Sequence, residues 1–341
     1  MKTLVLWLKK VNLQRWTMLV TVSIASSLLA PYAMAQQTEK AIKVRLGIAS
    51  KDSAFSAALV AQETGIAMKH GLEIDFVNMA PPTIPAALIA GDLEFAAPAQ
   101  TVTRAAIQGF PVRTVAIMMD RPNYTLLADK SIQTVNDLRG MTIVTGAKTS
   151  QPGSILLELL EGLRINPKDV KILWTADPPL RRTLLFRRDA QAGLFNLDIA
   201  FKIQRQDANV HILIPAEKMP QTPFAGLSVS KKFLDSKPDV VERMIRAHLE
   251  ANQFIKSKPK ESQAIFARLF ELTPAESHQL WELLVLAIVP DGLMKDDLIK
   301  VELLQDARSL GRPDLTEAQV RAAFDMRITE KAARDMNLLR R

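Results

Sequence analysis

Short apolar stretches alternate with segments of helical periodicity through the first third of the chain. The apolar stretches predict β-strands at residues 42–48, 72–77, 93–97 and 112–118. Segments with helical spacing lie between them, at residues 54–70, 85–90 and 102–108, and a glycine follows each one, at Gly71, Gly91 and Gly109. Glycine adopts the left-handed conformation that ends a helix at little cost. Units of strand, helix and strand in this order predict a mainly parallel sheet with right-handed crossovers.

The alternation begins again near residue 124 and then gives way to helix. Further strands are predicted at residues 124–128, 142–145, 170–174, 192–195, 210–214 and 225–230, with helices at 153–163 and 180–188. From residue 231 the pattern is almost continuously that of amphipathic helices. Prolines at helix-start positions divide this part, at Pro238, Pro259, Pro274 and Pro313. The chain is therefore an α/β protein with a helical C-terminal part.

The first 35 residues have the features of a cleavable secretory signal peptide. Lys2, Lys9, Lys10 and Arg15 form a positive leader without acidic residues, and a mostly apolar run follows at residues 16–30. Ala33 and Ala35 supply the small-x-small pattern of a cleavage site, so the mature chain is expected to begin at Gln36. The alternative is a permanent membrane anchor. It is disfavoured because the run is short and rich in Ser and Thr, whereas a spanning helix needs about 20 apolar residues.

Composition narrows the classes of function. The 341 residues carry a formal charge of +8, of which four charges lie in the leader, and Lys and Arg are scattered among Asp and Glu. We therefore expect no nucleic-acid partner. The chain has no cysteine, which excludes disulfides, thiolate metal sites and an N-terminal lipid anchor on cysteine. Its four histidines have no zinc-like spacing, and no motif of a nucleophilic enzyme is present. We expect no metal, no cofactor and no catalytic residue.

Several segments, in order along the chain, resemble one family of proteins. Residues 87–95, Ala-Leu-Ile-Ala-Gly-Asp-Leu-Glu-Phe, carry the likeness most clearly. The other matching segments are residues 44–48, 61–66, 69–74, 109–112, 135–140, 226–230, 233–234 and 238–241. In order and spacing the mature chain resembles the periplasmic substrate-binding proteins of ABC importers. Within them it is most similar to the branch that serves nitrate, alkanesulfonates, taurine and thiamine-pyrimidine precursors.

This resemblance implies a type II periplasmic-binding-protein fold. Two α/β lobes, each with a mainly parallel sheet, would be joined by two hinge crossings near residues 120–130 and 220–226. The first lobe would comprise residues 36–122 and 226–341, and residues 123–225 would form the inserted second lobe. Such a periplasmic protein, expected to be a monomer, would capture a small polar or anionic organic solute and deliver it to the membrane permease of an ABC importer.

Two alternatives remain open beside this reading. The pyrimidine-precursor synthases of thiamine biosynthesis share the fold, but they use a cysteine-rich motif and are not exported. An exported sensory module that binds a ligand without transport is the other. The sequence also departs from the family at Arg188, Gln191 and Asn196, where the family usually has a small residue, an acidic residue and an acidic-Pro pair. The contribution of the second lobe to the pocket is therefore the part that the resemblance transfers least.

Candidate ligand-binding residues follow the carboxyl ends of predicted parallel strands, where open α/β sheets bind ligands. In residues 50–55 and 98–101 we expect hydrogen bonds from four side chains and an apolar wall from a fifth. These are Ser50, Ser53, Gln100 and Thr101, with Phe55 as the wall.

A third segment, residues 146–154, follows a strand and opens a helix. Unpaired amides and the helix dipole favour an anion at such a position. The candidates here are Thr149, Ser150, Gln151 and Ser154, with Asn196 as a further contact from the second lobe. An ordinary helix cap with a solvent-facing Lys148 is the competing interpretation. For Arg181 and Arg182, which follow two prolines, the favoured interpretation is a solvated basic pair.

Overall fold

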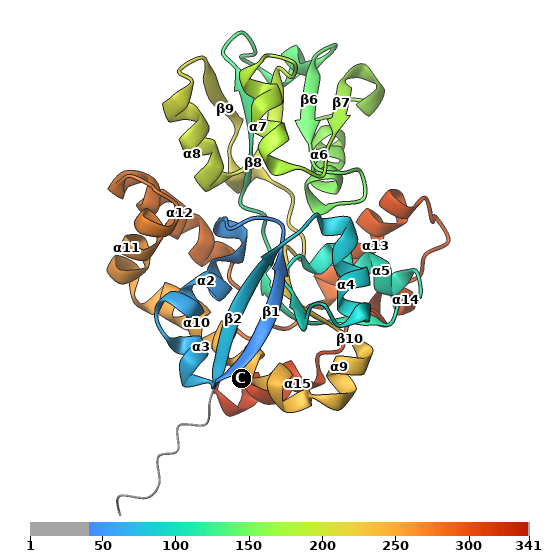
Figure 1. Ribbon diagram of the computed structural model, residues 1–341. Coiled ribbons are helices and arrows are strands. Elements are labelled where there is room, and N and C mark those ends of the chain that lie inside the picture. The colour runs from blue at the N-terminus through green and yellow to red at the C-terminus, as the bar shows by residue number, and fades with distance from the viewer. Residues whose placement is uncertain (1–40, 340–341) are drawn as a thin grey trace, which may run out of the picture. The chain divides into compact units, whose positions relative to one another are not determined.

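The computed structural model describes residues 41–339, and that part of the chain forms one compact unit (Figure 1). The predicted signal peptide and its cleavage site lie outside the described residues. Within residues 41–339, none of the helices has the length and apolar character that crossing a membrane requires.

The first sheet has five strands in the order β2-β1-β3-β10-β4. Strand β1 pairs in parallel with β2 and β3, whereas β10 pairs antiparallel with both β3 and β4. Four strands therefore point the same way and β10, which follows the strands of the second sheet along the chain, runs against them. The bounds are β1 Ile42–Ile48, β2 Leu72–Asn78, β3 Phe95–Ala96, β4 Val112–Met119 and β10 Ala225–Ser230.

The second sheet repeats this plan in the order β7-β6-β8-β5-β9. Strand β6 pairs in parallel with β7 and β8, and β5 pairs antiparallel with β8 and β9. Its strands are β5 Tyr124–Asp129, β6 Thr142–Thr145, β7 Lys171–Trp174, β8 Ala192–Asn196 and β9 Val210–Ile214. We call the part of the chain built on each sheet a lobe. The two mainly parallel sheets agree with the predicted fold class.

The chain passes between the two lobes twice. It leaves the first sheet after Met119 and enters the second at Tyr124, then returns between Ile214 and Ala225. The first connection is hydrogen-bonded to the second lobe, since the Asn123 carbonyl in the connection accepts from the backbone N–H of Leu197 at 2.9 Å.

In the N-terminal half of the first lobe, helices end at or next to glycines in the left-handed conformation. Gly71, Gly91 and Gly109 all have positive φ, between 71° and 94°, as their positions after predicted helices require. The single helix predicted at 54–70 is instead divided, because Gly65 also takes a left-handed conformation, with φ of 73°. The observed helices are α2 Ser56–Glu63, α3 Ile66–Lys69, α4 Ile84–Ala90 and α5 Ala99–Ile107.

The second lobe contains one helix that the sequence analysis missed. Helix α8, Leu197–Gln206, buries Leu197, Ala200 and Phe201 at the i, i+3, i+4 spacing of an amphipathic helix, and Asp198 lies in its first turn. That spacing could have revealed it. The other helices of this lobe are α6 Gln151–Gly162 and α7 Pro178–Phe186.

The C-terminal part is helical, as predicted, and packs against the first sheet. Helix α10, Pro238–Ser257, is central: its apolar face is buried against α2 and against α15, Arg327–Asp335. The remaining helices are α9 Lys231–Ser236, α11 Pro259–Leu269, α12 Pro274–Ala287, α13 Asp296–Leu310 and α14 Glu317–Arg321. Helix α13 lies beside α6 of the second lobe, so this helical part also reaches the boundary between the lobes.

Candidate ligand-binding site

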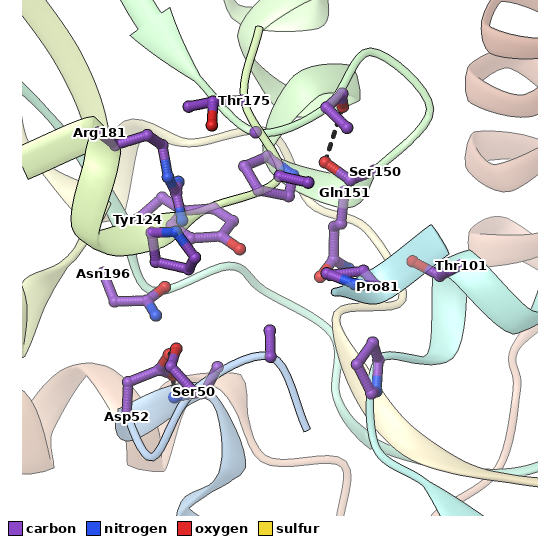
Figure 2. A pocket seen from close by; sticks show the side chains of 18 of the residues that line it. Ser50, Asp52, Pro81, Thr101, Tyr124, Ser150, Gln151, Thr175, Arg181 and Asn196 are labelled. Atoms are coloured by element: carbon purple, nitrogen blue, oxygen red, sulfur yellow. Dashed lines mark hydrogen bonds between the residues drawn. The ribbon is translucent and has the colours of Figure 1, made fainter. Parts of the chain in front are cut away.

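A cavity lies between the two lobes, where the loops after β1, β3 and β6 meet (Figure 2). It is a narrow cavity with a volume of about 50 Å³. Its walls carry serine, threonine, tyrosine and amide side chains together with one arginine and one aspartate. The space therefore suits a small polar solute.

Six of the ten side chains predicted from the sequence line this cavity. They are Ser50, Phe55, Thr101, Ser150, Gln151 and Asn196. Three come from the first lobe and three from the second, so the tertiary structure brings together segments that are up to 146 positions apart in the chain. That these residues bind a ligand stays a prediction.

The other four predicted side chains do not line the cavity, and most are engaged in bonds within the protein. Ser53 donates its hydroxyl to Asp198 and accepts a hydrogen bond from Asn123. Gln100 donates to Oε1 of Gln305 at 2.6 Å.

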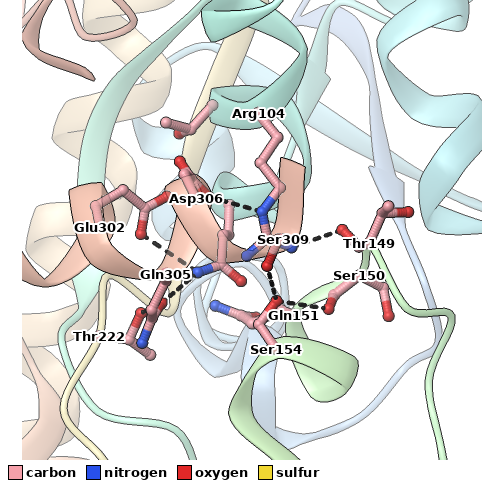
Figure 3. A network of polar contacts seen from close by, with 12 residues as sticks. Arg104, Thr149, Ser150, Gln151, Ser154, Thr222, Glu302, Gln305, Asp306 and Ser309 are labelled. Carbon is pink, nitrogen blue, oxygen red and sulfur yellow. Dashed lines mark hydrogen bonds and ion pairs between the residues drawn. The ribbon is translucent and has the colours of Figure 1, made fainter. Parts of the chain in front are cut away.

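Helix α13 lies beside the last two of the four, which flank the start of α6 (Figure 3). The Thr149 carbonyl accepts from Nη1 of Arg104 at 2.6 Å, and the Ser154 hydroxyl lies 3.2 Å from that of Ser309. Ser53, Thr149 and Ser154 therefore take part in contacts between the lobes, whereas Gln100 joins α5 to α13 within the first lobe.

Arg181 is the clearest correction to the sequence analysis. It was expected to form a solvated pair with Arg182, yet it lines the cavity from α7, and only Arg182 is exposed. Its Nη1 donates to the Leu194 carbonyl at 3.1 Å and its guanidinium lies 5.9 Å from the centre of the Phe195 ring, while Nε is buried without a partner. Burial lowers the pKa of Arg181 below its ordinary value. A half-buried cation whose Nε is buried with its donor free is an attachment point for an acidic group.

Two carboxylates, which the sequence analysis also missed, meet beneath the cavity. Asp52 is 3% exposed and lines the wall; it accepts hydrogen bonds from the Ser50 hydroxyl and, at 2.9 Å, from the Ala54 amide. Burial, followed by the charge of Asp198, raises the pKa of Asp52 to about 7. Asp198, 1% exposed, comes from α8 of the second lobe, and burial raises its pKa as well. Within residues 41–339, no group of three or more side chains is arranged to hold a metal ion.

Tyr124 forms another part of the wall at the start of β5. Its ring packs edge-on against Phe224, with ring centres 5.2 Å apart, and its hydroxyl points into the space beside Arg181 (Figure 2). Burial raises the pKa of Tyr124, so the phenol keeps its proton and acts as a neutral hydrogen-bonding group. Both rings belong to the connections between the lobes or to their ends, so the wall is continuous with the hinge.

The start of α6 lacks the side-chain cap of an ordinary helix start, and anion binding there stays a prediction. Ser150 occupies the N-cap position, but its hydroxyl donates to the Ala147 carbonyl at 2.7 Å and does not cap the helix. The side chain of Gln151 donates to the carbonyls of Pro223 and Phe224 at 3.0 and 2.8 Å, which ties α6 to the second connection. The first amides of α6 thus lack a side-chain cap from Ser150 and open beside the cavity.

The two sheets, the double connection and the enclosed cleft define the fold of the periplasmic binding proteins. The chain belongs to the NMT1/THI5 like family, whose model matches residues 52–262. The family resemblance and the fold class predicted from the sequence are thereby confirmed.

The relatives and structural neighbours are distant. A Brucella abortus (strain 2308) protein, named as a binding protein, is 24% identical over 263 residues, which cover 75% of this chain and 79% of that protein. The alkanesulfonate-binding protein SsuA from Xanthomonas axonopodis pv. citri, in a structure bound to MOPS, superimposes with a TM-score of 0.69 at 19% identity, over 83% of this chain and 98% of SsuA.

The same fold is also found in an enzyme. The desulfurization enzyme DSZB superimposes with a TM-score of 0.60 at 13% identity, over 86% of this chain and 99% of the enzyme. Because one fold serves binding and catalysis, function has to be argued from the site.

Proposed function

We propose that this protein is an exported solute-binding protein that captures a small polar or anionic organic solute and delivers it to an ABC-type permease. The observation that carries the proposal is the cavity between the lobes, with the half-buried guanidinium of Arg181, whose Nε is buried without a partner, in its wall. Export is supported by the leader at residues 1–35, and delivery to a permease by the likeness to proteins such as SsuA.

The charge of Arg181 indicates an acidic group on the solute. Among residues 41–339, no carboxylate forms an ion pair with Arg181, and its Nε has no hydrogen-bond partner. A buried charge without a partner is costly, and a planar guanidinium matches a carboxylate or sulfonate with two parallel hydrogen bonds. The uncapped start of α6 adds the backbone N–H of Gln151 and a favourable dipole from another side of the same space, whereas the Ser150 amide already donates to the Ala147 carbonyl at 2.8 Å.

We infer that the protein captures its solute by closing the two lobes, because both lobes line the cavity. Ser50, Phe55 and Thr101 belong to the first lobe, whereas Arg181 and Asn196 belong to the second. A solute that touches both sets favours the closed arrangement, because its contacts to the second set exist only there. We infer that the hinges are residues 120–123 and 215–224, which places the lobe boundaries close to residues 122 and 225. In this role the protein is not an enzyme and acts as a monomer.

A panel of solutes tests the proposal on the purified mature chain. Alkanesulfonates, taurine, MOPS, nitrate, aromatic carboxylates and aminopyrimidines would be screened by thermal shift, and hits measured by calorimetry. A solute present at 100 times its Kd stabilises the folded chain by about 2.7 kcal/mol, which is readily seen. If every one of these classes leaves the melting temperature unchanged, the proposed function is overturned.

Adjacent arginines provide a matched pair of variants. Arg181→Met is expected to weaken binding of an acidic solute by about 100-fold, since a buried charge-assisted hydrogen bond contributes roughly 1.5–3 kcal/mol. Arg182→Met removes the same charge one residue away, from an exposed position, and should bind within about twofold of the unchanged chain. Equal binding by both variants would show that Arg181 is not the anchor.

A further inference from the structure

The two buried carboxylates beneath the cavity come from opposite lobes. Asp52 follows β1 of the first lobe and Asp198 lies in the first turn of α8 in the second. Ser53, the neighbour of Asp52, donates its hydroxyl to Oδ1 of Asp198, so the two carboxylates flank a single residue. Their proximity therefore depends on the lobes being closed.

Neither carboxylate has an ion-pair partner within 4.0 Å among the described residues. The charged and titratable groups that face them are Arg181 from α7, Tyr124 from β5 and Lys202 from α8. Lys202 is already paired with Glu271 at 3.0 Å, and Arg181 acts on Asp52 only at longer range. Two like charges buried together without a counter-ion are unfavourable, and protonation of one of them removes the conflict.

We propose that Asp52 and Asp198 take up a proton as the lobes close, so that closure over the solute strengthens as the pH falls. The inference concerns regulation of the proposed binding site, and it rests on the proposed function only in taking the lobes to open and close. An acidic solute on Arg181 would reinforce the effect, because it would offset the positive charge that favours ionised Asp52.

The direction and size of the effect follow from linkage. In the open state, with both carboxylates exposed, Asp52 is expected to titrate near an ordinary aspartate, at about 3.9. In the closed state its pKa is raised to about 7, chiefly by burial and then by Asp198. The closed state therefore binds more protons between these two values, and closure weakens as the pH rises through 7. Between pH 8 and pH 6 the closing equilibrium should strengthen by about tenfold.

The absence of cysteine makes this measurable without any solute. A nitroxide attached to Asn78→Cys, at the exposed end of β2, reports by paramagnetic relaxation enhancement on the methyl group of Ala176, a second-lobe residue that lines the same groove as Asn78. The enhancement is weighted towards short distances, so it detects a minor closed population. We expect it to grow several-fold, up to about tenfold, as the pH is lowered from 8 to 6.

Neutral isosteres identify the groups responsible. The double variant Asp52→Asn, Asp198→Asn keeps the hydrogen-bond acceptors and should show an enhancement independent of pH, while Asp75→Asn, which removes an exposed carboxylate on β2, should keep the wild-type dependence. If the double variant does not fold, the two single variants replace it, and each should reduce the slope.

An enhancement in the unmodified chain that stays constant from pH 8 to pH 6, or a double variant with the wild-type slope, would overturn the proposal. Since no solute is present, either result leaves the binding function itself untouched, and failure of the solute panel leaves this experiment intact.

Discussion

Replacing Arg104 by Met tests whether the lobes are joined by a buried charge network rather than by surface pairing. Arg104, on α5, is 4% exposed at its side chain and pairs with Asp306 of α13, which is fully buried, through Nε at 2.7 Å (Figure 3). Its Nη1 reaches the Thr149 carbonyl of the second lobe at 2.6 Å. Burial, followed by the charge of Asp306, raises the pKa of Glu302 well above its ordinary value, and burial also raises the pKa of Asp306, while the charge of Arg104 opposes both shifts.

The expected cost is that of leaving Asp306 buried without its cation. Removing one partner of a buried pair typically destabilises a protein by about 3–5 kcal/mol, which is a large part of a total stability of about 5–15 kcal/mol. In the variant Asp306 must bind a proton in order to fold, so its folded pKa lies above its unfolded one. Burial raises the folded pKa of Asp306 in the unchanged chain as well, and removing Arg104 raises it further. The stability of the variant relative to the unchanged chain therefore falls as the pH rises, by up to about 1.4 kcal/mol per pH unit in the window between these two folded pKa values.

Urea unfolding at pH 5 and pH 8 measures both quantities. Arg321→Met provides the control, because Arg321 pairs with Glu317 and Asp296 at the surface and its removal should cost no more than about 1 kcal/mol at either pH. The double variant Arg104→Met, Asp306→Leu should regain much of the loss, since it removes the orphaned charge as well. A cost for Arg104→Met below about 1 kcal/mol that is equal at both pH values would refute the reasoning.

Three further predictions concern separate parts of the molecule. Gly153→Ala should lower the free energy of unfolding in urea by about 1–3 kcal/mol, because a Cβ there would lie 2.3 Å from the Ala147 carbonyl oxygen. Gly162→Ala, at the other end of α6 with nothing within 4 Å, should be neutral or slightly stabilising, and equal effects of the two variants would contradict this. Burial lowers the pKa of the His248 ring to about 4, so NMR titration should find the ring neutral down to about pH 5. The stability that the neutral ring contributes should be lost as the pH falls from about 6.5 towards 4, and a ring that titrates near 6.5 would refute its burial. The exported protein should have the intact mass of a chain that begins at Gln36, and a retained leader in the purified protein would disprove the predicted cleavage.

The site could be predicted from the sequence to the level of its segments but not of its side chains. The loops after β1 and β3 and the start of α6 were expected at the ends of strands, because parallel sheets place ligands there, and all three reach the cavity. Which side chains of a segment face the cavity depends on the direction in which each one leaves the helix axis. Thr101 faces the cavity, whereas its neighbour Gln100 faces α13, because successive helical residues point about 100° apart.

The period of the hydrophobic pattern and the glycines that end helices were enough to determine the class of fold and most of its elements. Both are local properties: a glycine sets the backbone conformation at the end of a helix, and the hydrophobic period sets which face of a helix or strand is apolar. Only the tertiary structure decided that Arg181 is half-buried and lines the cavity while Arg182 is exposed, and that Asp52 lies within electrostatic reach of Asp198 from 146 positions away. The reason is that burial and charge pairing depend on which surfaces the two lobes bring together, and no periodicity along the chain records that choice.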